Sequence, residues 1–174
     1  GLGVTSSSPP VPTRERVRDD DGTVRFVSLA TFNKLSPEQL NVWDAILEGV
    51  GPQAELELIL GMPAEMGDEE EFLARIRKAF PGKRLNLIAR TSREDCINRL
   101  QDSDIYLDSF PFGGYNTLVE AFSVGLPVVA LEGRHAYGRF GVAMSGMLGL
   151  PLDQVSGFDY SSYCAAAVAL GRDV

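Results

Sequence analysis

Residues 23–50, TVRFVSLATFNKLSPEQLNVWDAILEGV, contain one strand followed directly by one helix. The segment 23–30 is short and rich in β-branched and aromatic residues, as strands are. A helix is predicted over 36–50, because apolar residues recur on one face at helical spacing. Its start carries three signals: Ser36 as N-cap, Pro37 at the first helical position, and Gln39 to complete a capping box. The stretch is therefore predicted to be the first half of a βαβ unit.

The same alternation continues along the chain. Short apolar segments predict further strands at 55–61, 84–89, 104–107 and 127–131, and amphipathic segments predict helices at 68–80, 92–101, 117–124, 138–148 and 160–171. Such alternation is typical of a parallel sheet with helices on both faces. We therefore expect an α/β, Rossmann-like domain over 23–174. Residues 1–22, rich in Ser, Pro and charge, are expected to be a flexible linker.

Composition limits the classes of partner. The 174 residues are 44% hydrophobic and 23% charged, with a formal net charge of −8. That charge disfavours nucleic acid, which is bound by basic surfaces. No run of 18 apolar residues is present, so no membrane association is expected. Cys96 and Cys164 match no metal or redox spacing, which favours core thiols and a cytoplasmic location. The linker at one end and a helix ending at the other suggest a piece of a longer protein.

The predicted topology also locates a ligand site. Ligands of open parallel sheets lie outside the carboxyl ends of the strands. The segments that leave those ends hold most of the unusual residues, so we expect a basic rim on an acidic protein, which favours a small anionic ligand. These residues are Lys34, Arg90, Arg93, Gly113, Gly114, Asn116, Thr117, Arg134, His135 and Arg139.

The segment 108–121, DSFPFGGYNTLVEA, places two glycines in front of a helix. It is neither GxGxxG nor a P-loop. The N–H groups and dipole at the helix start would still stabilise a phosphate, with Asn116 and Thr117 as extra donors, and the glycines would let the backbone approach it. Glu120, one turn later, suits the hydroxyls of a ribose. The alternative is structural: Thr117 and Glu120 form a capping box, and the glycines only ease a turn.

A family resemblance favours the ligand. The segment 104–150, with FPFG and the Asn-containing turn after it, resembles the donor half of the O-linked N-acetylglucosamine transferases and of the related SPINDLY and adhesin-glucosylating enzymes. The similarity extends upstream through FNKLSPEQLNVWDAIL, residues 32–47, and more weakly downstream to YCAAAVALGRD, residues 163–173. It covers nearly everything from Val24 onward.

The resemblance implies a role for individual residues. Lys34 is the implied catalytic residue, in contact with the diphosphate of the donor, and Glu120 would take the ribose hydroxyls. Two positions depart from the family: Tyr115 stands at a histidine position, and Cys96 stands where animal enzymes have a histidine that stacks on the base. The implied nucleotide-sugar-binding residues are Asn33, Arg90, Thr91, Arg93, Gly113, Gly114, Tyr115, Asn116, Thr117 and Glu120, with His135 and Arg139 as further candidates.

The resemblance also implies a mechanism. Such enzymes have a GT-B fold of two Rossmann-like domains, of which this chain would be the C-terminal one. They invert the anomeric centre and use no metal or cofactor, because a lysine and a helix N-terminus stabilise the departing diphosphate. The implied donor is UDP-GlcNAc or UDP-glucose. The implied acceptor is Ser, Thr or Asn of a protein bound through the other half, so the fragment alone is expected to be inactive.

One further motif bears on this interpretation. DSD at 102–104 is similar to a metal-binding DxD, but it is predicted at the amino end of a strand, on the opposite rim from the ligand.

Two other functions fit the implied nucleotide-binding residues. One is a non-catalytic nucleotide-binding module that regulates a partner, and the other is the donor half of a different GT-B enzyme such as an epimerase.

Overall fold

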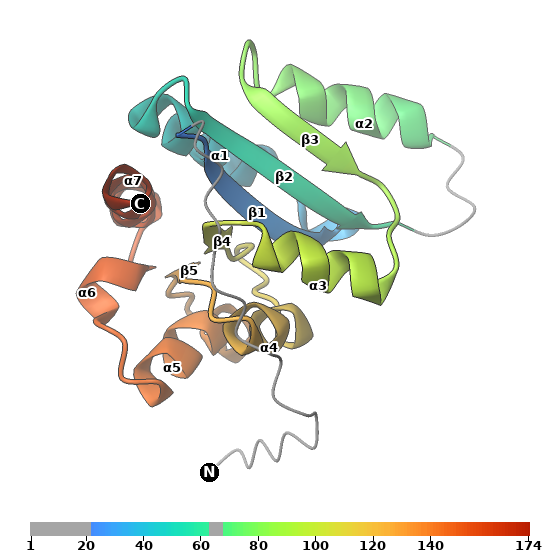
Figure 1. The fold of residues 1–174 in the computed structure, drawn as a ribbon. Coiled ribbons are helices and arrows are strands. Elements are labelled where there is room, and N and C mark those ends of the chain that lie inside the picture. Colours follow the sequence, from blue (N-terminus) through green and yellow to red (C-terminus); the bar gives the residue numbers. More distant parts are fainter. Residues whose placement is uncertain (1–21, 63–67) are drawn as a thin grey trace.

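The computed structural model describes residues 22–62 and 68–174, and the strands within them form one six-stranded sheet whose neighbours are all parallel (Figure 1). The strand order is β3-β2-β1-β4-β5-β6, so the order reverses between β1 and β4. The predicted α/β, Rossmann-like sheet is confirmed. Apart from Gly22, the predicted linker lies outside the described residues. The strands are β1 Val24–Thr31, β2 Ala54–Gly61, β3 Arg84–Ile88, β4 Ile105–Leu107, β5 Val128–Leu131 and β6 Ser156–Gly157.

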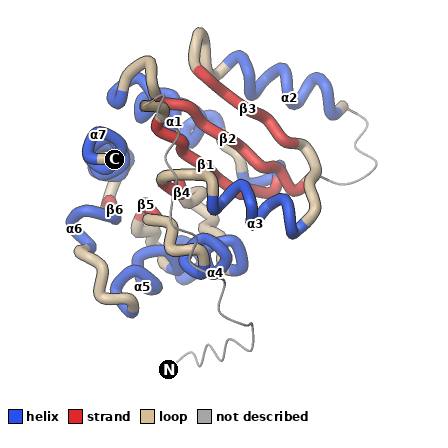
Figure 2. Tube along the Cα trace, in the orientation of Figure 1, coloured by secondary structure: helices blue, strands red, loops and turns tan. Residues whose placement is uncertain are grey.

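The helices flank both faces of the sheet (Figure 2). All six predicted helices are present with bounds shifted by a few residues, whereas α6, β6 and two 3-10 turns were not predicted, because two to four residues show no periodicity. No helix in the described ranges is long and apolar enough to cross a membrane. The helices are α1 Pro37–Val50, α2 Glu69–Lys78, α3 Arg93–Gln101, α4 Asn116–Ser123, α5 Phe140–Met147, α6 Leu152–Val155 and α7 Tyr160–Asp173, and the 3-10 turns are η1 Phe32–Lys34 and η2 Ala136–Gly138.

Alternation along the strands builds two cores. Successive side chains of a strand point to opposite faces. Phe26 and Leu56 therefore enter one core, which α1, α2 and α7 cover. Val27, Ile59 and Tyr106 enter the other core, against α3 and α4. Because both faces are apolar, the central strands read as nearly continuous hydrophobic runs.

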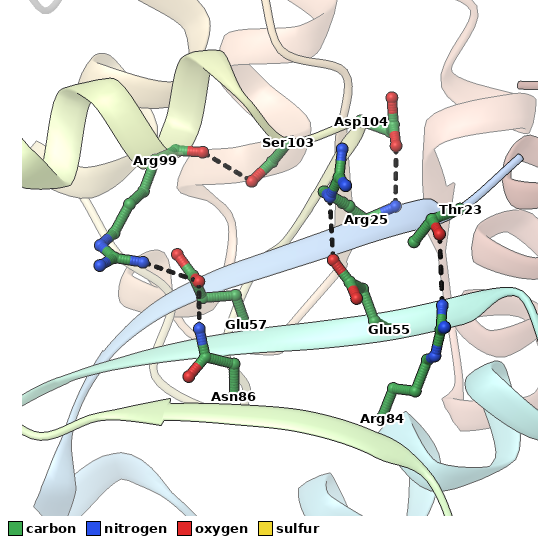
Figure 3. A network of polar contacts seen from close by, with 9 residues as sticks. All are labelled: Thr23, Arg25, Glu55, Glu57, Arg84, Asn86, Arg99, Ser103 and Asp104. Carbon is green, nitrogen blue, oxygen red and sulfur yellow. Dashed lines mark hydrogen bonds and ion pairs between the residues drawn. The ribbon is translucent and has the colours of Figure 1, made fainter. Parts of the chain in front are cut away.

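Polar side chains replace apolar ones near the amino ends of β1, β2 and β3 on the α3 side (Figure 3). Arg25 Nε donates to Glu55 at 2.9 Å, and Arg99 of α3 donates to Glu57 at 2.9 Å. Asp104 accepts the backbone N–H of Arg25 at 2.7 Å. The DSD sequence lies at the amino end of β4, as predicted. It is therefore at the opposite rim of the sheet from the segments that leave the carboxyl ends of the strands.

The start of α1 confirms one expectation and corrects another. Ser36 Oγ accepts the N–H of Gln39 at 3.2 Å, which confirms the N-cap. The predicted capping box is wrong, because the Gln39 side chain is fully buried and makes no bond back to the backbone N–H of Ser36. With its amide oriented so that both bonds form, it donates to the carbonyl oxygens of Lys34 at 3.3 Å and Phe110 at 3.2 Å. This side chain therefore ties η1 to the loop after β4.

Candidate functional site

A cavity of about 700 Å³ lies at the carboxyl ends of β1, β2 and β3, beside the start of α4. This is the place where the strand order reverses, and ligands of open α/β sheets bind at such a point. Its volume is within the range of small-molecule sites. The segments after β1, β2 and β3 supply one part of its wall, and the 114–120 region supplies another.

Most of the residues predicted from sequence line this cavity. Gly113 stands just behind the wall, where its carbonyl oxygen accepts a hydrogen bond from Lys34 Nζ at 3.2 Å. Asn33, His135 and Arg139 lie outside the wall: His135 stacks on Tyr137, with ring centroids 5.2 Å apart, and Arg139 Nε donates to the Gly133 carbonyl at 2.8 Å. The predicted residues that line the cavity are Lys34, Arg90, Thr91, Arg93, Gly114, Tyr115, Asn116, Thr117 and Glu120.

The start of α4 contradicts the capping box of the structural alternative for this loop. The helix begins at Asn116, with Tyr115 as its N-cap residue, so Thr117 lies inside the first turn and cannot act as a cap. Within the described residues, no side chain caps the first N–H groups of α4. A helix start without a cap leaves N–H donors for another partner. The Lys34 ammonium lies at the same loop, so two sources of positive potential meet there.

Two ion pairs organise the other end of the cavity. Arg93 Nε donates to Glu120 Oε1 at 3.0 Å, which joins α3 to α4. The Arg93 side chain is 77% exposed and that of Glu120 is 20% exposed, so the pair stands at the cavity mouth with its carboxylate inward. Arg90 donates twice to Glu69 of α2, at 2.6 and 3.3 Å. Such partly exposed pairs add little stability, but they hold side chains in place.

Cys96 forms part of the apolar wall between these groups. Burial, and then the nearby Glu120 carboxylate, raise the pKa of its thiol to about 11. A thiol with a raised pKa is neutral and a poor nucleophile near neutral pH. The side chain therefore offers a nonpolar contact to whatever occupies the cavity.

The sequence analysis did not identify Asp108, which lies beneath the loop that contains Gly113 and Gly114, called the glycine loop below. Its side chain is only 4% exposed, and Oδ1 accepts the N–H of Gly114 at 3.0 Å. Burial raises the pKa of this carboxyl from 3.8 to about 7, while the N–H groups of Gly114 and Ser109 and the ammonium of Lys34 oppose that rise. An aspartate directly at the end of a buried strand and before a Gly-Gly turn was a signal that could have identified it.

The structure gives an internal reason for the glycines. A Cβ at Gly114 would collide with the hydroxyl of Thr117, and a Cβ at Gly113 would lie 2.9 Å from Asp108 Oδ2 and 3.0 Å from the Tyr137 carbonyl oxygen. The loop therefore needs glycine to pack against its own helix and against Asp108. This packing requirement is separate from the close approach to a ligand that the sequence predicts for the same two glycines.

We expect Gly114→Val to lower the free energy of unfolding by about 1–3 kcal/mol, because it overpacks a tight site. Gly146→Val is the matched control: a Cβ there has 3.8 Å to its nearest neighbour, so its effect should stay within about 0.5 kcal/mol. Urea denaturation of both variants makes the comparison. Equal stability of the two variants would show that packing does not require a glycine at 114.

The sheet order and this cavity define an α/β domain with a cavity at the switch point of its sheet. The chain belongs to Glycosyl transferase family 41, because the profile of that family matches residues 4–174. The predicted relation to the O-linked N-acetylglucosamine transferases is therefore confirmed.

Relatives and solved structures agree with this assignment. The chain is 27% identical over 157 residues to a Solanum lycopersicum protein named "Probable UDP-N-acetylglucosamine--peptide N-acetylglucosaminyltransferase SPINDLY", covering 88% of this chain and 16% of that protein. It is 26% identical over 161 residues to the Caenorhabditis elegans UDP-N-acetylglucosamine--peptide N-acetylglucosaminyltransferase, covering 92% of this chain and 14% of that one. The chain thus spans about one sixth of the length of such relatives.

A mutant of the Thermobaculum terrenum O-GlcNAc transferase superposes with a TM-score of 0.80 at 29% identity, over 96% of this chain and 31% of that one. The structure of trehalose-6-phosphate from Escherichia coli bound with UDP-2-fluoro glucose has a TM-score of 0.57 at 14% identity, over 87% of this chain and 40% of that one. The second likeness concerns the fold alone. The structural matches support the predicted GT-B type of domain.

Proposed function

We propose that this chain is the donor-binding part of a glycosyltransferase and that its cavity holds a UDP-sugar. The observation that carries the proposal is the meeting of Lys34, the glycine loop and the uncapped start of α4 at one end of the cavity. The names of the relatives, which specify UDP-N-acetylglucosamine as donor and peptide as acceptor, support the same ligand class.

The diphosphate would lie at the Lys34 end of the cavity. Negative charge grows on the leaving UDP as the bond to the sugar breaks, and preorganised donors stabilise such charge most in the transition state. Lys34 supplies an ammonium, the first turn of α4 supplies N–H groups, and the side chains of Asn116 and Thr117 add donors. In this proposal the transfer inverts the anomeric centre, and no metal or cofactor takes part.

The nucleoside would lie at the Glu120 end. The Glu120 carboxylate can accept both ribose hydroxyls, while its partner Arg93 offsets a charge that would otherwise repel the phosphates. Arg90, Thr91 and Arg93 would border the base, with the neutral thiol of Cys96 as an apolar contact. The acceptor would be Ser, Thr or Asn of a protein, held by a part of the enzyme outside this chain.

Titration calorimetry with UDP, GDP, uridine, UDP-GlcNAc and UDP-glucose tests the proposal. We expect UDP to bind at least about tenfold more tightly than uridine, because each charge-assisted hydrogen bond to a phosphate contributes roughly 1.5–3 kcal/mol. Equal affinity for UDP and uridine would overturn the phosphate assignment, and equal affinity for UDP and GDP would overturn that of the base. Binding of UDP without any contribution from either sugar would favour a regulatory nucleotide-binding module.

A further inference from the structure

Asp108 is held rigidly beneath the glycine loop. Its backbone N–H donates to the Val129 carbonyl at 2.9 Å, and its carbonyl accepts the Tyr163 hydroxyl at 3.1 Å. Tyr163 in turn accepts the indole N–H of Trp43 at 3.1 Å, so β5, α7 and α1 all fix this residue. The backbone of Asp108 is therefore fixed in place beneath the loop.

The loop encloses the Asp108 carboxylate with backbone. A Cβ at Gly113 would lie 2.9 Å from Oδ2, and a Cβ at Gly141 of α5 would lie 3.2 Å from it. Gly114 donates its N–H to Oδ1 at 3.0 Å. One of the N–H groups beside the proposed phosphate position is thus already engaged by a buried acid.

Lys34 is the cation that faces this acid among the described residues, and its charge favours the ionised form. The same Lys34 is the proposed partner of the diphosphate. Tyr106 of β4 and Tyr163 of α7 also face Asp108, and burial raises the pKa of both phenols, so both stay neutral. From α5, the residue that packs against Asp108 is Gly141, which carries no charge.

We propose that Asp108 is a positioning residue that takes up a proton from solvent when a nucleoside diphosphate binds, so that the charge of the buried carboxylate no longer competes with the phosphates for Lys34 and for the N–H groups of the glycine loop. This proposal rests on the proposed function. Its physical cause is competition: an ionised Asp108 repels the diphosphate and attracts the same ammonium. Protonation removes that charge while the acid stays in place.

The expected pH dependence has a definite sign. The pKa of Asp108 in the free protein is about 7, and a bound diphosphate raises it further. Below about pH 7 the acid is already protonated, so binding requires no proton. Above that pH binding must bring one, so affinity falls as pH rises, by at most about tenfold for each pH unit.

Calorimetry with UDP at pH 8, in buffers of different ionisation enthalpy, measures the proton directly. The phosphates of UDP are ionised at this pH, so their own protonation does not contribute. We expect the parent chain to take up as much as one proton with UDP and none with uridine. Asp108→Asn, which keeps an oxygen for the Gly114 N–H, should take up none and should bind UDP at pH 8 at least as tightly as the parent.

Asp153→Asn, at an exposed acid on α6, is the matched control and should behave like the parent. Equal proton uptake by the parent and Asp108→Asn would overturn the proposal. If Asp108→Asn does not fold, the parent alone decides: UDP binding without proton uptake overturns the role of Asp108 and leaves the proposed function intact. Absence of UDP binding would overturn both the role of Asp108 and the proposed function.

Discussion

Replacement of Lys34 by alanine is expected to lower the affinity for UDP on the order of ten- to a hundredfold. The substitution removes a charge-assisted hydrogen bond worth roughly 1.5–3 kcal/mol, and each decade of affinity corresponds to about 1.4 kcal/mol. Affinity for uridine, which has no phosphate, should be unchanged. In the full-length enzyme the loss in turnover should exceed the loss in binding, because leaving-group charge is greatest in the transition state. Calorimetry and steady-state kinetics measure the two losses.

The matched control for this substitution is Lys78→Ala, at an exposed lysine on the last turn of α2. That turn precedes β3, so it lies at the amino end of the sheet, away from the cavity. Lys34 does make one contact of its own, to the Gly113 carbonyl, so thermal melts of both variants must accompany the titrations. Unchanged UDP affinity in a folded Lys34→Ala chain would contradict the assignment of the diphosphate.

Stability is expected to fall as pH rises from about 4 to about 7.5, through the titration of Asp108. Its folded-state pKa of about 7 is above the unfolded value of 3.8, so the folded chain binds the proton more tightly. The stabilisation is complete below the unfolded pKa and is lost as pH rises through the folded pKa. The difference between the two pKa values corresponds to a change in the free energy of unfolding on the order of 4 kcal/mol.

Urea denaturation of the parent and Asp108→Asn, at intervals between pH 4 and 8, measures this contribution. Asparagine cannot ionise, so the unfolding free energy of the Asp108→Asn variant should lack the decline expected for the parent. The pKa of Asp159 is lowered by its capping bonds to Ser162, so this acid titrates below the window and acts in the opposite direction. Parallel curves for parent and variant would show that Asp108 does not titrate near neutrality.

Local patterns in the sequence determined most of the fold. Ser36 and Pro37 marked the start of α1 where the structure has it, and the period of apolar residues separated helices from strands. These signals lie within about fifteen residues of one another, so they can be read without knowing the rest of the chain. The same is true of the glycine loop, whose place at the end of a strand indicated a ligand site. The cavity wall gathers Lys34 and Thr117 as that topology predicts.

Only the tertiary structure decided which polar groups are buried and what pairs with them. Gln39 has the sequence position of a capping residue, yet burial against Phe110 directs it to two carbonyl groups. The sequence places Asp108 at the end of a strand but does not show that it is buried; Gly141 and Tyr163 pack against it, and burial raises its pKa. Phe110 lies 71 residues from Gln39, and Gly141 and Tyr163 lie 33 and 55 residues from Asp108. Burial and charge depend on the atoms that surround a group in space, and a local pattern carries no information about neighbours that distant.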